Sequence, residues 1–252
     1  GSQSETQKPP HGWRAWRQWV KREEGKEGRI DTTYLREQFG HVCVTVHNCA
    51  QKVRGLDELA TREMTISEYL DWWDSPRTSS GLKTPRELFY LKDWNFAKEF
   101  PEYKLYEWPP WFREDWLNHF ETNFASDHRF VYLGPAGSFT PLHRDTLHSF
   151  SWSANVTGIK KWWMLPPHCT SALHSTDGTQ LFDLREIDAA RFPRWEAARR
   201  HMIEFQQGPG DIVFVPSGWW HQVENVTDTL SVNHNWVNAA NVHFSWQLLQ
   251  DT

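Results

Sequence analysis

The sequence predicts a mainly β protein, built as a sandwich or barrel with helical decorations. Two observations favour this fold class. Short apolar runs of strand length follow one another from residue 129 onward, and turn residues such as Gly134-Pro135 and Pro166-Pro167 separate them. Many short strands at such spacing are typical of all-β sandwiches and barrels. A more helical segment near Asp188–Met202 interrupts the strands and predicts an insertion.

The first half of the chain is expected to mix helices with strands. A helix over Asp31–Phe39, capped by one of its first two residues, would end at Gly40. Thr65 and Glu68 have the spacing of a capping box, which predicts a helix that runs to Trp73. The other expected elements are a helical stripe at Trp13, Trp16 and Val20, strands over His41–Val46 and Leu88–Leu91, and a helix near Trp111–Phe120.

The second half is expected to form strands separated by turns, because its apolar runs are short and bounded by glycine and proline. A last helix is expected to start at Val242. The expected strands are Phe130–Leu133, Phe139–His143, Phe150–Thr157, Lys161–Leu165, Ile212–Val215, Gln222–Val226 and Thr229–Asn235.

This pattern predicts four parts of the chain. Residues 1–12 are polar and are expected to be a disordered tag or linker. Residues 13–128 are expected to form a mixed α/β part that packs on a barrel. Residues 129–241 would form the barrel core, with the helical insertion near 188–202. Residues 242–252 would begin a C-terminal helix that is cut short.

The composition argues against several classes of protein. The chain has 27 basic and 32 acidic residues among 252, and no basic run is longer than Lys21-Arg22 or Arg199-Arg200. Nucleic-acid-binding proteins usually carry a clustered basic surface, so no direct nucleic-acid partner is expected. No apolar run approaches the ~18 residues of a membrane helix. Three widely separated cysteines, Cys43, Cys49 and Cys169, predict a reducing compartment, and we expect a cytoplasmic protein.

Three side chains form a candidate metal site. His143 and Asp145 are two residues apart, so on an extended strand they point to the same side. His221 follows a strand and a tight turn in Pro216-Ser217-Gly218-Trp219-Trp220-His221. Two histidines with one carboxylate are the ligand set of non-haem iron(II) oxygenases. His148 is five residues from His143, which places it on the opposite strand face, and we predict that it is not a ligand.

Two adjacent lysines, Lys160 and Lys161, lie in an expected strand. Neighbouring strand residues point to opposite faces, so one ammonium group must reach solvent while the other can face the interior. An edge strand with two solvent-reaching lysines is one interpretation. The other is a buried lysine that meets an anionic dicarboxylate, with a hydroxyl such as that of Thr140 as a second partner.

The candidate residues stand in three longer motifs, which follow in this order: Phe139-Thr140-Pro141-x-His143-x-Asp145, Gly158-x-Lys160-Lys161-Trp162, and Gly210-Asp211-Ile212-Val213-Phe214-Val215-Pro216-x-Gly218-Trp219-Trp220-His221. In these motifs and their order the chain resembles the Jumonji-C oxygenases, whose fold is a double-stranded β-helix of the cupin type. Further stretches agree with one subfamily and include Phe130–Ser138, Ser149–Val156 and Asn233–Asn238.

The resemblance implies roles for individual residues. Ser153 stands where a related hydroxylase has a co-substrate-contacting asparagine, so this sequence departs from that relative there. By position, the implied iron ligands are His143, Asp145 and His221; the partner of the far carboxylate of 2-oxoglutarate is Lys160, with hydroxyl partners Thr140 and Tyr90; and Asn233 and Asn235 lie around the other end of the co-substrate.

The resemblance also implies an activity. Within its subfamily, iron(II), 2-oxoglutarate and O2 hydroxylate a lysine side chain at C4 in the eukaryotic class-one translation release factor, so a protein substrate is expected. Two alternatives stay open. One is an Nε-methyl-lysine demethylase, which would use the same centre on a methyl group. The other is a cupin that binds partners without catalysis, although such a scaffold need not keep all three ligands and the lysine.

Overall fold

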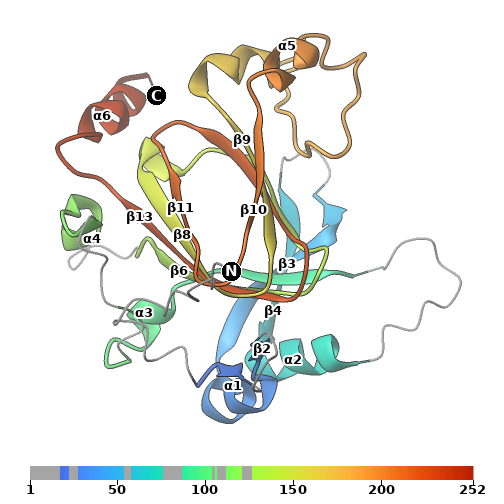
Figure 1. The fold of residues 1–252 in the computed structure, drawn as a ribbon, viewed down its shortest axis with the longest axis vertical. Helices are drawn as coiled ribbons and strands as arrows, with labels where there is room; N and C mark the ends of the chain where they lie inside the picture. Colours follow the sequence, from blue (N-terminus) through green and yellow to red (C-terminus); the bar gives the residue numbers. More distant parts are fainter. Residues whose placement is uncertain are drawn as a thin grey trace, which may run out of the picture.

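Two antiparallel sheets wrap around a common interior in the computed structural model, which describes residues 18–22, 28–53, 58–75, 87–103, 106, 112–120 and 127–251 (Figure 1). The larger sheet has the strand order β11-β8-β13-β6-β5-β3-β4, and the smaller has the order β10-β9-β12-β7. This arrangement confirms the predicted mainly β fold. It is consistent with a double-stranded β-helix, in which two sheets form the walls of one barrel.

The strands of the two sheets come from both halves of the chain. A short pair, β1 (Val20–Lys21) and β2 (Arg29–Ile30), lies apart from them. The larger sheet consists of β3 (Cys43–Lys52), β4 (Leu59–Thr65), β5 (Phe89–Trp94), β6 (Arg129–Gly134), β8 (Phe150–Thr157), β11 (Ile212–Val215) and β13 (Thr229–Trp236). The smaller sheet consists of β7 (Phe139–His143), β9 (Lys160–Leu165), β10 (Ile203–Gln207) and β12 (Trp220–Asn225).

Helices decorate the outside of the sheets (Figure 1). Asp31 caps the first of them by accepting a hydrogen bond from the Tyr34 backbone N–H at 3.0 Å. Thr65 and Glu68 form the predicted capping box of the second. The helices are α1 (Thr32–Phe39), α2 (Ile66–Asp74), α3 (Phe96–Glu99), α4 (Trp116–Phe120), α5 (Trp195–Arg199) and α6 (Val242–Asp251), with short 3-10 turns η4 (Thr146–His148) and η5 (Pro167–Ala172).

Three apolar clusters mark the layers of the molecule. One includes Leu133 and Val232 and packs α1 and α2 against the outer face of the larger sheet. A second includes Leu165 and Trp220 and covers the outer face of the smaller sheet with η5 and α5. The third lies between the sheets and consists of Trp162, Met164, Val213, Val215 and Val223.

The interior of the barrel is polar on the side of the larger sheet. In β13, Leu230 and Val232 belong to the outer cluster, so the alternating Ser231 and Asn233 face inward. The same alternation in β8 turns Ser153 inward. The space between the sheets therefore combines polar and apolar side chains, the usual lining of a site for a partly polar ligand.

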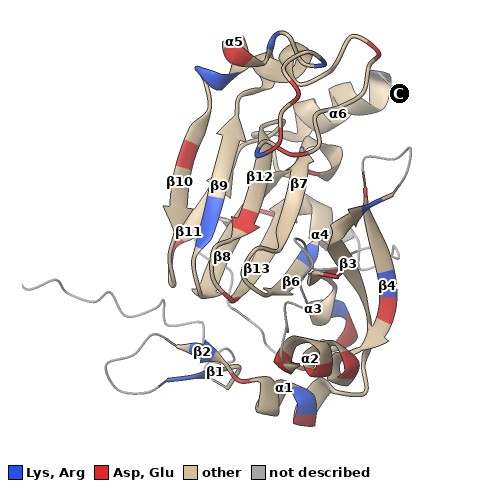
Figure 2. Cartoon of the chain, turned by 90° about the vertical axis from the view of Figure 1, so that its right-hand side faces the viewer, with Lys and Arg blue, Asp and Glu red and all other residues tan. Residues whose placement is uncertain are grey.

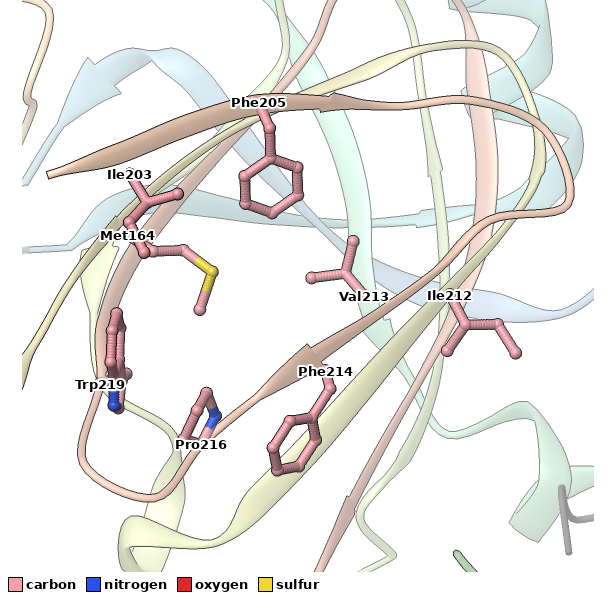
Figure 3. A pocket seen from close by; sticks show the side chains of 8 residues that line it. All are labelled: Met164, Ile203, Phe205, Ile212, Val213, Phe214, Pro216 and Trp219. Atoms are coloured by element: carbon pink, nitrogen blue, oxygen red, sulfur yellow. The ribbon is translucent and has the colours of Figure 1, made fainter. Parts of the chain in front are cut away.

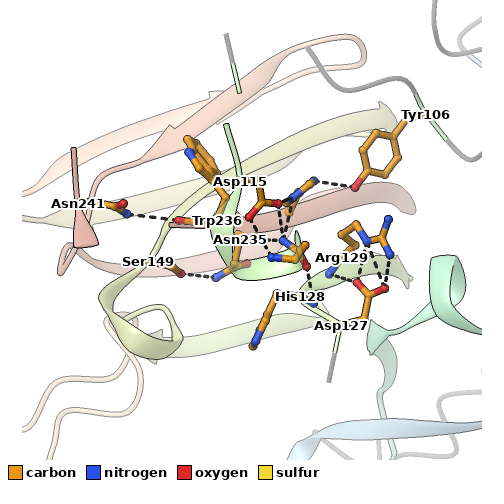
Figure 4. Close-up of polar contacts among 11 residues, drawn as sticks. Tyr106, Asp115, Asp127, His128, Arg129, Ser149, Asn235, Trp236 and Asn241 are labelled. Atoms are coloured by element: carbon orange, nitrogen blue, oxygen red, sulfur yellow. Dashed lines mark hydrogen bonds and ion pairs between the residues drawn. The ribbon is translucent and has the colours of Figure 1, made fainter. Parts of the chain in front are cut away.

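A buried polar network ties the segment 112–120 to the outer face of β13 (Figure 4). The Nε2 atom of His234 lies 2.7 Å from a carboxylate oxygen of Asp115, and its Nδ1 atom lies 2.8 Å from the hydroxyl of Tyr106. The Asn118 amide also donates to the backbone carbonyl of Asn235 at 2.8 Å. These contacts stabilise the outer face of β13, the strand whose inner face carries Asn233.

Several predicted elements agree with the structure, and the helices of α1 and α2 are confirmed with their caps. The predicted helical stripe is wrong at Val20, which lies in β1, while Trp13 and Trp16 are outside the described residues. The helix near Trp111–Phe120 is shorter than predicted, because α4 begins only at Trp116.

The prediction missed the short pair β1 and β2 and two strands of the main sheets, and the latter two lie at sheet edges. Strand β4 ends the larger sheet and β10 ends the smaller one. Edge strands expose much of their surface, so they lack the apolar alternation that predicts a strand. The predicted insertion over Asp188–Met202 contains a single short helix, α5, followed directly by β10. Among the described residues, no helix is long and apolar enough to cross a bilayer.

Candidate metal centre

Two strands of the smaller sheet bring the three predicted ligands together. His143 ends β7, and His221 lies directly opposite it in β12. Their ring centroids are 4.1 Å apart. Asp145 lies two residues beyond β7, and its Oδ1 atom is 3.9 Å from Nε2 of His221. One ligand atom from each of the three residues lies within 4.8 Å of the other two, a spacing that could hold a metal ion.

Hydrogen bonds from the surrounding residues orient each of these groups. Nδ1 of His143 lies 2.8 Å from the Pro141 carbonyl, and Nδ1 of His221 lies 3.3 Å from the Trp219 carbonyl. A carbonyl only accepts, so each Nδ1 carries the proton and each Nε2 keeps a lone pair. The Ser151 hydroxyl donates to Oδ2 of Asp145 at 2.7 Å, which leaves Oδ1 available. Such outer contacts typically fix ligand orientation in metal sites.

The electrostatics of the site favour neutral imidazole. Burial and, to a smaller extent, the nearby His221 lower the pKa of His143 to about 4, although Asp145 acts in the opposite direction. His143 is therefore uncharged at neutral pH, the form that binds a metal. Trp162 stacks beside His221 with ring centroids 5.9 Å apart. The predicted non-ligand His148 lies in η4, outside the group of three.

Lys160 points into the barrel, and its neighbour Lys161 points out. Lys160 is 2% exposed, and its Nζ atom donates to the Ser231 hydroxyl at 2.5 Å. Lys161 forms an ion pair with Glu204 at 2.8 Å on the outer face. These two lysines lie in the blue band of β9, and Glu204 lies in the red band of β10 (Figure 2). Of the two interpretations of this lysine pair, the structure favours the buried one.

The buried amine of Lys160 lacks a charged partner. Burial lowers the pKa of Lys160 to about 7, and within the described part of the chain no carboxylate pairs with it. The Tyr132 ring centroid lies 5.4 Å from its Nζ atom. An unpaired ammonium is costly to bury, so the position is suited to an anion brought in from solution.

Hydroxyl and amide groups surround this lysine. Tyr90 is buried, and its hydroxyl interacts with the side chains of Asn225 and Thr140. Burial raises the pKa of Tyr90 far above its ordinary value, so the phenol stays protonated and can donate. Asn225 is the cross-strand partner of Lys160. Of the groups predicted to contact the far carboxylate of a dicarboxylate, Lys160 in β9 and Thr140 in β7 lie on the two sides of β12, and Tyr90 comes from β5 of the larger sheet.

Several buried polar atoms of the inner walls have no hydrogen-bond partner among the described residues. Each such atom costs about 1–3 kcal/mol when nothing satisfies it, and buried polar atoms in folded proteins are rarely left so. Hydrogen-bond donors brought in by a bound molecule or by water would satisfy the amide oxygens among them, and a hydroxyl among them could donate to a keto acid. The inward-facing examples include Asn225 Oδ1, Asn233 Oδ1 and Ser153 Oγ.

Asn233 and Asn235 differ in their surroundings. Asn233 has its Oδ1 atom buried and unbonded, whereas the Asn235 amide donates to the Ser149 hydroxyl at 3.1 Å. Ser149 directly follows η4, the turn after Asp145. Asn235 therefore holds the turn next to a candidate ligand, while Asn233 keeps its amide oxygen available to a bound molecule.

Sequence reasoning assigned no role to three residues that contact the site: Ser151, Ser231 and Tyr132. Ser151 bonds to Asp145, and Ser231 accepts the hydrogen bond of Lys160. A usable signal was present in the alternation of Leu230-Ser231-Val232-Asn233, which marks a strand with one polar face. The pairing of strands that brings these side chains to the site depends on register, which the alternation does not specify.

An apolar pocket of about 350 Å³ opens between the edges of the two sheets (Figure 3). It lies between β10 and β11, at the edge of the smaller and of the larger sheet. Met164 lines it and is the cross-strand neighbour of His221. Its lining residues are Met164, Ile203, Phe205, Ile212, Val213, Phe214, Pro216 and Trp219.

Comparison with known proteins identifies the family. A family model described as a cupin-like domain matches residues 9–241. The chain belongs to this family. The resemblance of this cupin-like chain to the Jumonji-C oxygenases is likewise confirmed by its relatives.

Similar proteins are named as two kinds of enzyme, oxygenases and a demethylase. A "2-oxoglutarate and iron-dependent oxygenase JMJD4" of Gallus gallus is 40% identical over 244 residues, which are 95% of this chain and 56% of the relative. The Homo sapiens protein of that name is 40% identical over 243 residues, with the same two shares. An "Arginine-specific demethylase JMJ20" of Arabidopsis thaliana is 37% identical over 255 residues, 94% of this chain and 52% of the relative. The chain spans about half the length of these curated relatives.

Proposed function

We propose that the chain is an Fe(II)- and 2-oxoglutarate-dependent oxygenase that hydroxylates a lysine side chain of a protein. The observation that carries the proposal is the convergence of two imidazoles and a carboxylate in a barrel that also buries an unpaired lysine. Two histidines with one carboxylate suit Fe(II) and leave adjacent coordination positions open. The relatives named as 2-oxoglutarate and iron-dependent oxygenases support the same interpretation.

His143, Asp145 and His221 would hold the iron. Their fit rests on three features: two imidazoles whose Nδ1 atoms face backbone carbonyls, an available carboxylate oxygen, and the outer hydrogen bonds that orient these groups. When bound, iron and 2-oxoglutarate supply the oxidation of an unactivated C–H bond by O2, and the protein supplies orientation and charge. The apolar cluster beside the ligands, with Trp162 and Met164, would exclude water from this volume.

Lys160 would bind the far carboxylate of 2-oxoglutarate. Tyr90 and Thr140 would donate hydroxyl hydrogen bonds to the same carboxylate. Because burial lowers the pKa of Lys160 to about 7, a bound carboxylate would favour its ammonium form and draw a proton from solution. Asn233 would contact the other end of the co-substrate by donating from its side-chain amide N–H, because the keto-acid end offers only acceptors.

The proposed substrate is the eukaryotic class-one translation release factor, with a lysine oxidised at C4. The proposal comes from the subfamily resemblance of the sequence, and the substrate would place the reaction in the cytoplasm. The experiment incubates the iron-loaded protein with 2-oxoglutarate and a lysine-containing release-factor segment. The expected result is stoichiometric succinate and a mass gain of one oxygen atom on the lysine. Succinate formation without any oxidised residue in the segment would contradict this substrate.

Demethylation is a second candidate reaction. The Arabidopsis thaliana relative named as an arginine-specific demethylase is nearly as similar as the relatives named as oxygenases. The same centre would then act on an N-methyl group of lysine or arginine. Methylated histone peptides, incubated in parallel, would lose the mass of a methylene group and release formaldehyde. Turnover with neither substrate, in the presence of iron, would favour a binding scaffold.

A further inference from the structure

A bulge in β5 brings an acidic residue into contact with Tyr132 of the neighbouring strand β6. The pairing of β5 with β6 shifts register between Leu91 and Trp94, where β5 has one residue more than its partner. Asp93 lies in this bulge with a φ of 60°, in the left-handed region that favours glycine. Such a conformation strains a non-glycine residue and is concentrated at functional sites. Bulges beside active sites often re-aim a side chain.

The carboxylate of Asp93 already binds an alkylammonium group. Its Oδ2 atom lies 2.6 Å from Nζ of Lys92, and its Oδ1 atom accepts a hydrogen bond from the hydroxyl of Tyr132. Partial burial acts to raise the pKa of Asp93, but Lys92 and these hydrogen bonds outweigh it and hold the pKa below its ordinary value. The side chain is nevertheless 40% exposed, so an incoming cation can reach it.

Tyr132 connects this carboxylate to the proposed co-substrate site. Its hydroxyl contacts Asp93, and its ring centroid lies 5.4 Å from Nζ of Lys160. The charge of Asp145 also acts on Tyr132, and the charge of Lys92 acts on His143. The bulge is therefore within electrostatic reach of the candidate metal ligands.

Within the described part of the chain, Lys92 is the one ion-pair partner of this carboxylate. The neighbouring strand β3 carries another basic residue, His47, which pairs with Tyr90 of β5. Burial lowers the pKa of His47 to about 4, so it is uncharged at neutral pH. An ammonium group that displaced Lys92 would meet an anion rather than a competing charge.

We propose that Asp93 binds the cationic side chain of the substrate, and that Lys92 occupies this position until the substrate arrives. The proposal rests on the proposed function and names the residue that selects a cationic target. The ion pair of Asp93 with Lys92 shows that the carboxylate accepts an alkylammonium at 2.6 Å. A substrate ammonium would form the same charge-assisted hydrogen bond, and an uncharged side chain of equal length would not.

The test compares equilibrium binding of two peptides to iron-free protein loaded with Mn(II) and 2-oxoglutarate without O2. One is a lysine-containing release-factor peptide, and the other has norleucine in place of the lysine. Asp93→Asn keeps a residue that tolerates positive φ and can still accept from Tyr132. It is expected to weaken binding of the lysine peptide roughly ten- to a hundredfold and to leave binding of the norleucine peptide unchanged.

Lys92→Met is expected to have the opposite effect on binding of the lysine peptide. Removing the competing ammonium should tighten binding of the lysine peptide several-fold, a gain that loss of structure would not produce. The matched control is Lys161→Met, which removes a lysine that pairs with a carboxylate at 2.8 Å on the outer face. It should leave the binding of both peptides unchanged.

Three results would overturn the proposal: equal effects of Asp93→Asn on both peptides, no effect on either, or no measurable binding of the lysine peptide. Analysis of the reaction products separates failure of the cation-site proposal from failure of the proposed function. Binding that depends on Asp93 without any oxidised peptide would refute lysyl hydroxylation and leave the cation site standing. Hydroxylation that is insensitive to Asp93→Asn would refute the cation site alone.

Discussion

His143 and His221 face each other as a cross-strand pair of β7 and β12, with ring centroids 4.1 Å apart. The two residues are far apart in sequence, and only antiparallel pairing brings them together. The register of β12 on β7 shifts just after His221, and this irregularity lies beside the candidate metal ligands. Barrels often carry such irregularities at their rims and next to sites, where they direct a side chain.

Replacing His143 with alanine should abolish turnover. A metal site with three protein ligands loses both affinity and geometry when one of them is removed. The measurement is succinate formation together with iron content after equilibrium dialysis. His148→Asn is the matched control, because His148 lies outside the group of three and asparagine tolerates its φ of 49°. Full activity of His143→Ala would show that the ligand is assigned wrongly.

Ser151→Ala should weaken metal binding without preventing folding. The Ser151 hydroxyl donates to Oδ2 of Asp145 at 2.7 Å, so its loss leaves the carboxylate free to rotate. Outer hydrogen bonds of this kind typically contribute about 10- to 100-fold to metal affinity. The check is a titration with Fe(II) without O2, alongside thermal unfolding of the metal-free protein. A lower midpoint of unfolding with unchanged iron affinity would argue against this orienting role.

Lys160→Met should raise the dissociation constant of 2-oxoglutarate more than a hundredfold. A buried carboxylate that loses its charged partner costs about 3–5 kcal/mol. The same substitution should stabilise the ligand-free protein at pH 7, because it removes a buried amine that has no carboxylate partner among the described residues. Isothermal titration with 2-oxoglutarate checks the first expectation, and denaturant unfolding checks the second. Unchanged affinity for 2-oxoglutarate would show that another cation binds its far carboxylate.

The pH dependence of this lysine follows from its pKa of about 7, which is lower than the ordinary value. Between pH 7 and about 10.4 the unfolded chain binds a proton at this position that the folded chain does not. The contribution of Lys160 to stability therefore rises with pH across this window. Binding of 2-oxoglutarate should take up a proton near pH 8 and weaken at higher pH. Calorimetry in buffers of different ionisation enthalpy measures this uptake.

His234→Gln should destabilise the fold by about 2–4 kcal/mol at pH 7, because Asp115 and Tyr106 each lose a partner. Burial lowers the pKa of His234, although Asp115 acts against it. The unfolded chain then binds more protons below pH 6.5, so wild-type stability falls as the pH drops. The difference between wild type and variant should therefore narrow in acid. Denaturant unfolding at several pH values measures it, and a constant difference would contradict the neutral imidazole.

The residues of the proposed site could be predicted because their chemistry is unusual where it occurs. A histidine and an aspartate two residues apart, a lysine inside an apolar strand, and a histidine after a glycine turn are each distinctive in a β-rich sequence. The strand Phe139–His143 was predicted with the bounds that the structure shows. Apolar alternation and flanking turns define such buried strands well.

The other features of the fold and the site depend on strand register and solvent exposure, which a residue pattern indicates less clearly. Strands β4 and β10 were missed because edge strands are largely solvated. Ser231 and Tyr132 are common residue types, and their contact with Lys160 arises only from the order of strands. Asp93 could not be singled out either, because a bulge of one residue depends on how two strands pair.

Anaerobic binding of Fe(II), measured with and without 2-oxoglutarate, tests the central claim most directly. The account predicts one iron per chain for the wild type, bound more tightly when 2-oxoglutarate is present. It predicts that His143→Ala loses the iron and that Lys160→Met keeps the iron but loses the tightening. Wild-type protein that binds no iron, or triad variants that bind it as tightly as the wild type, would contradict the account.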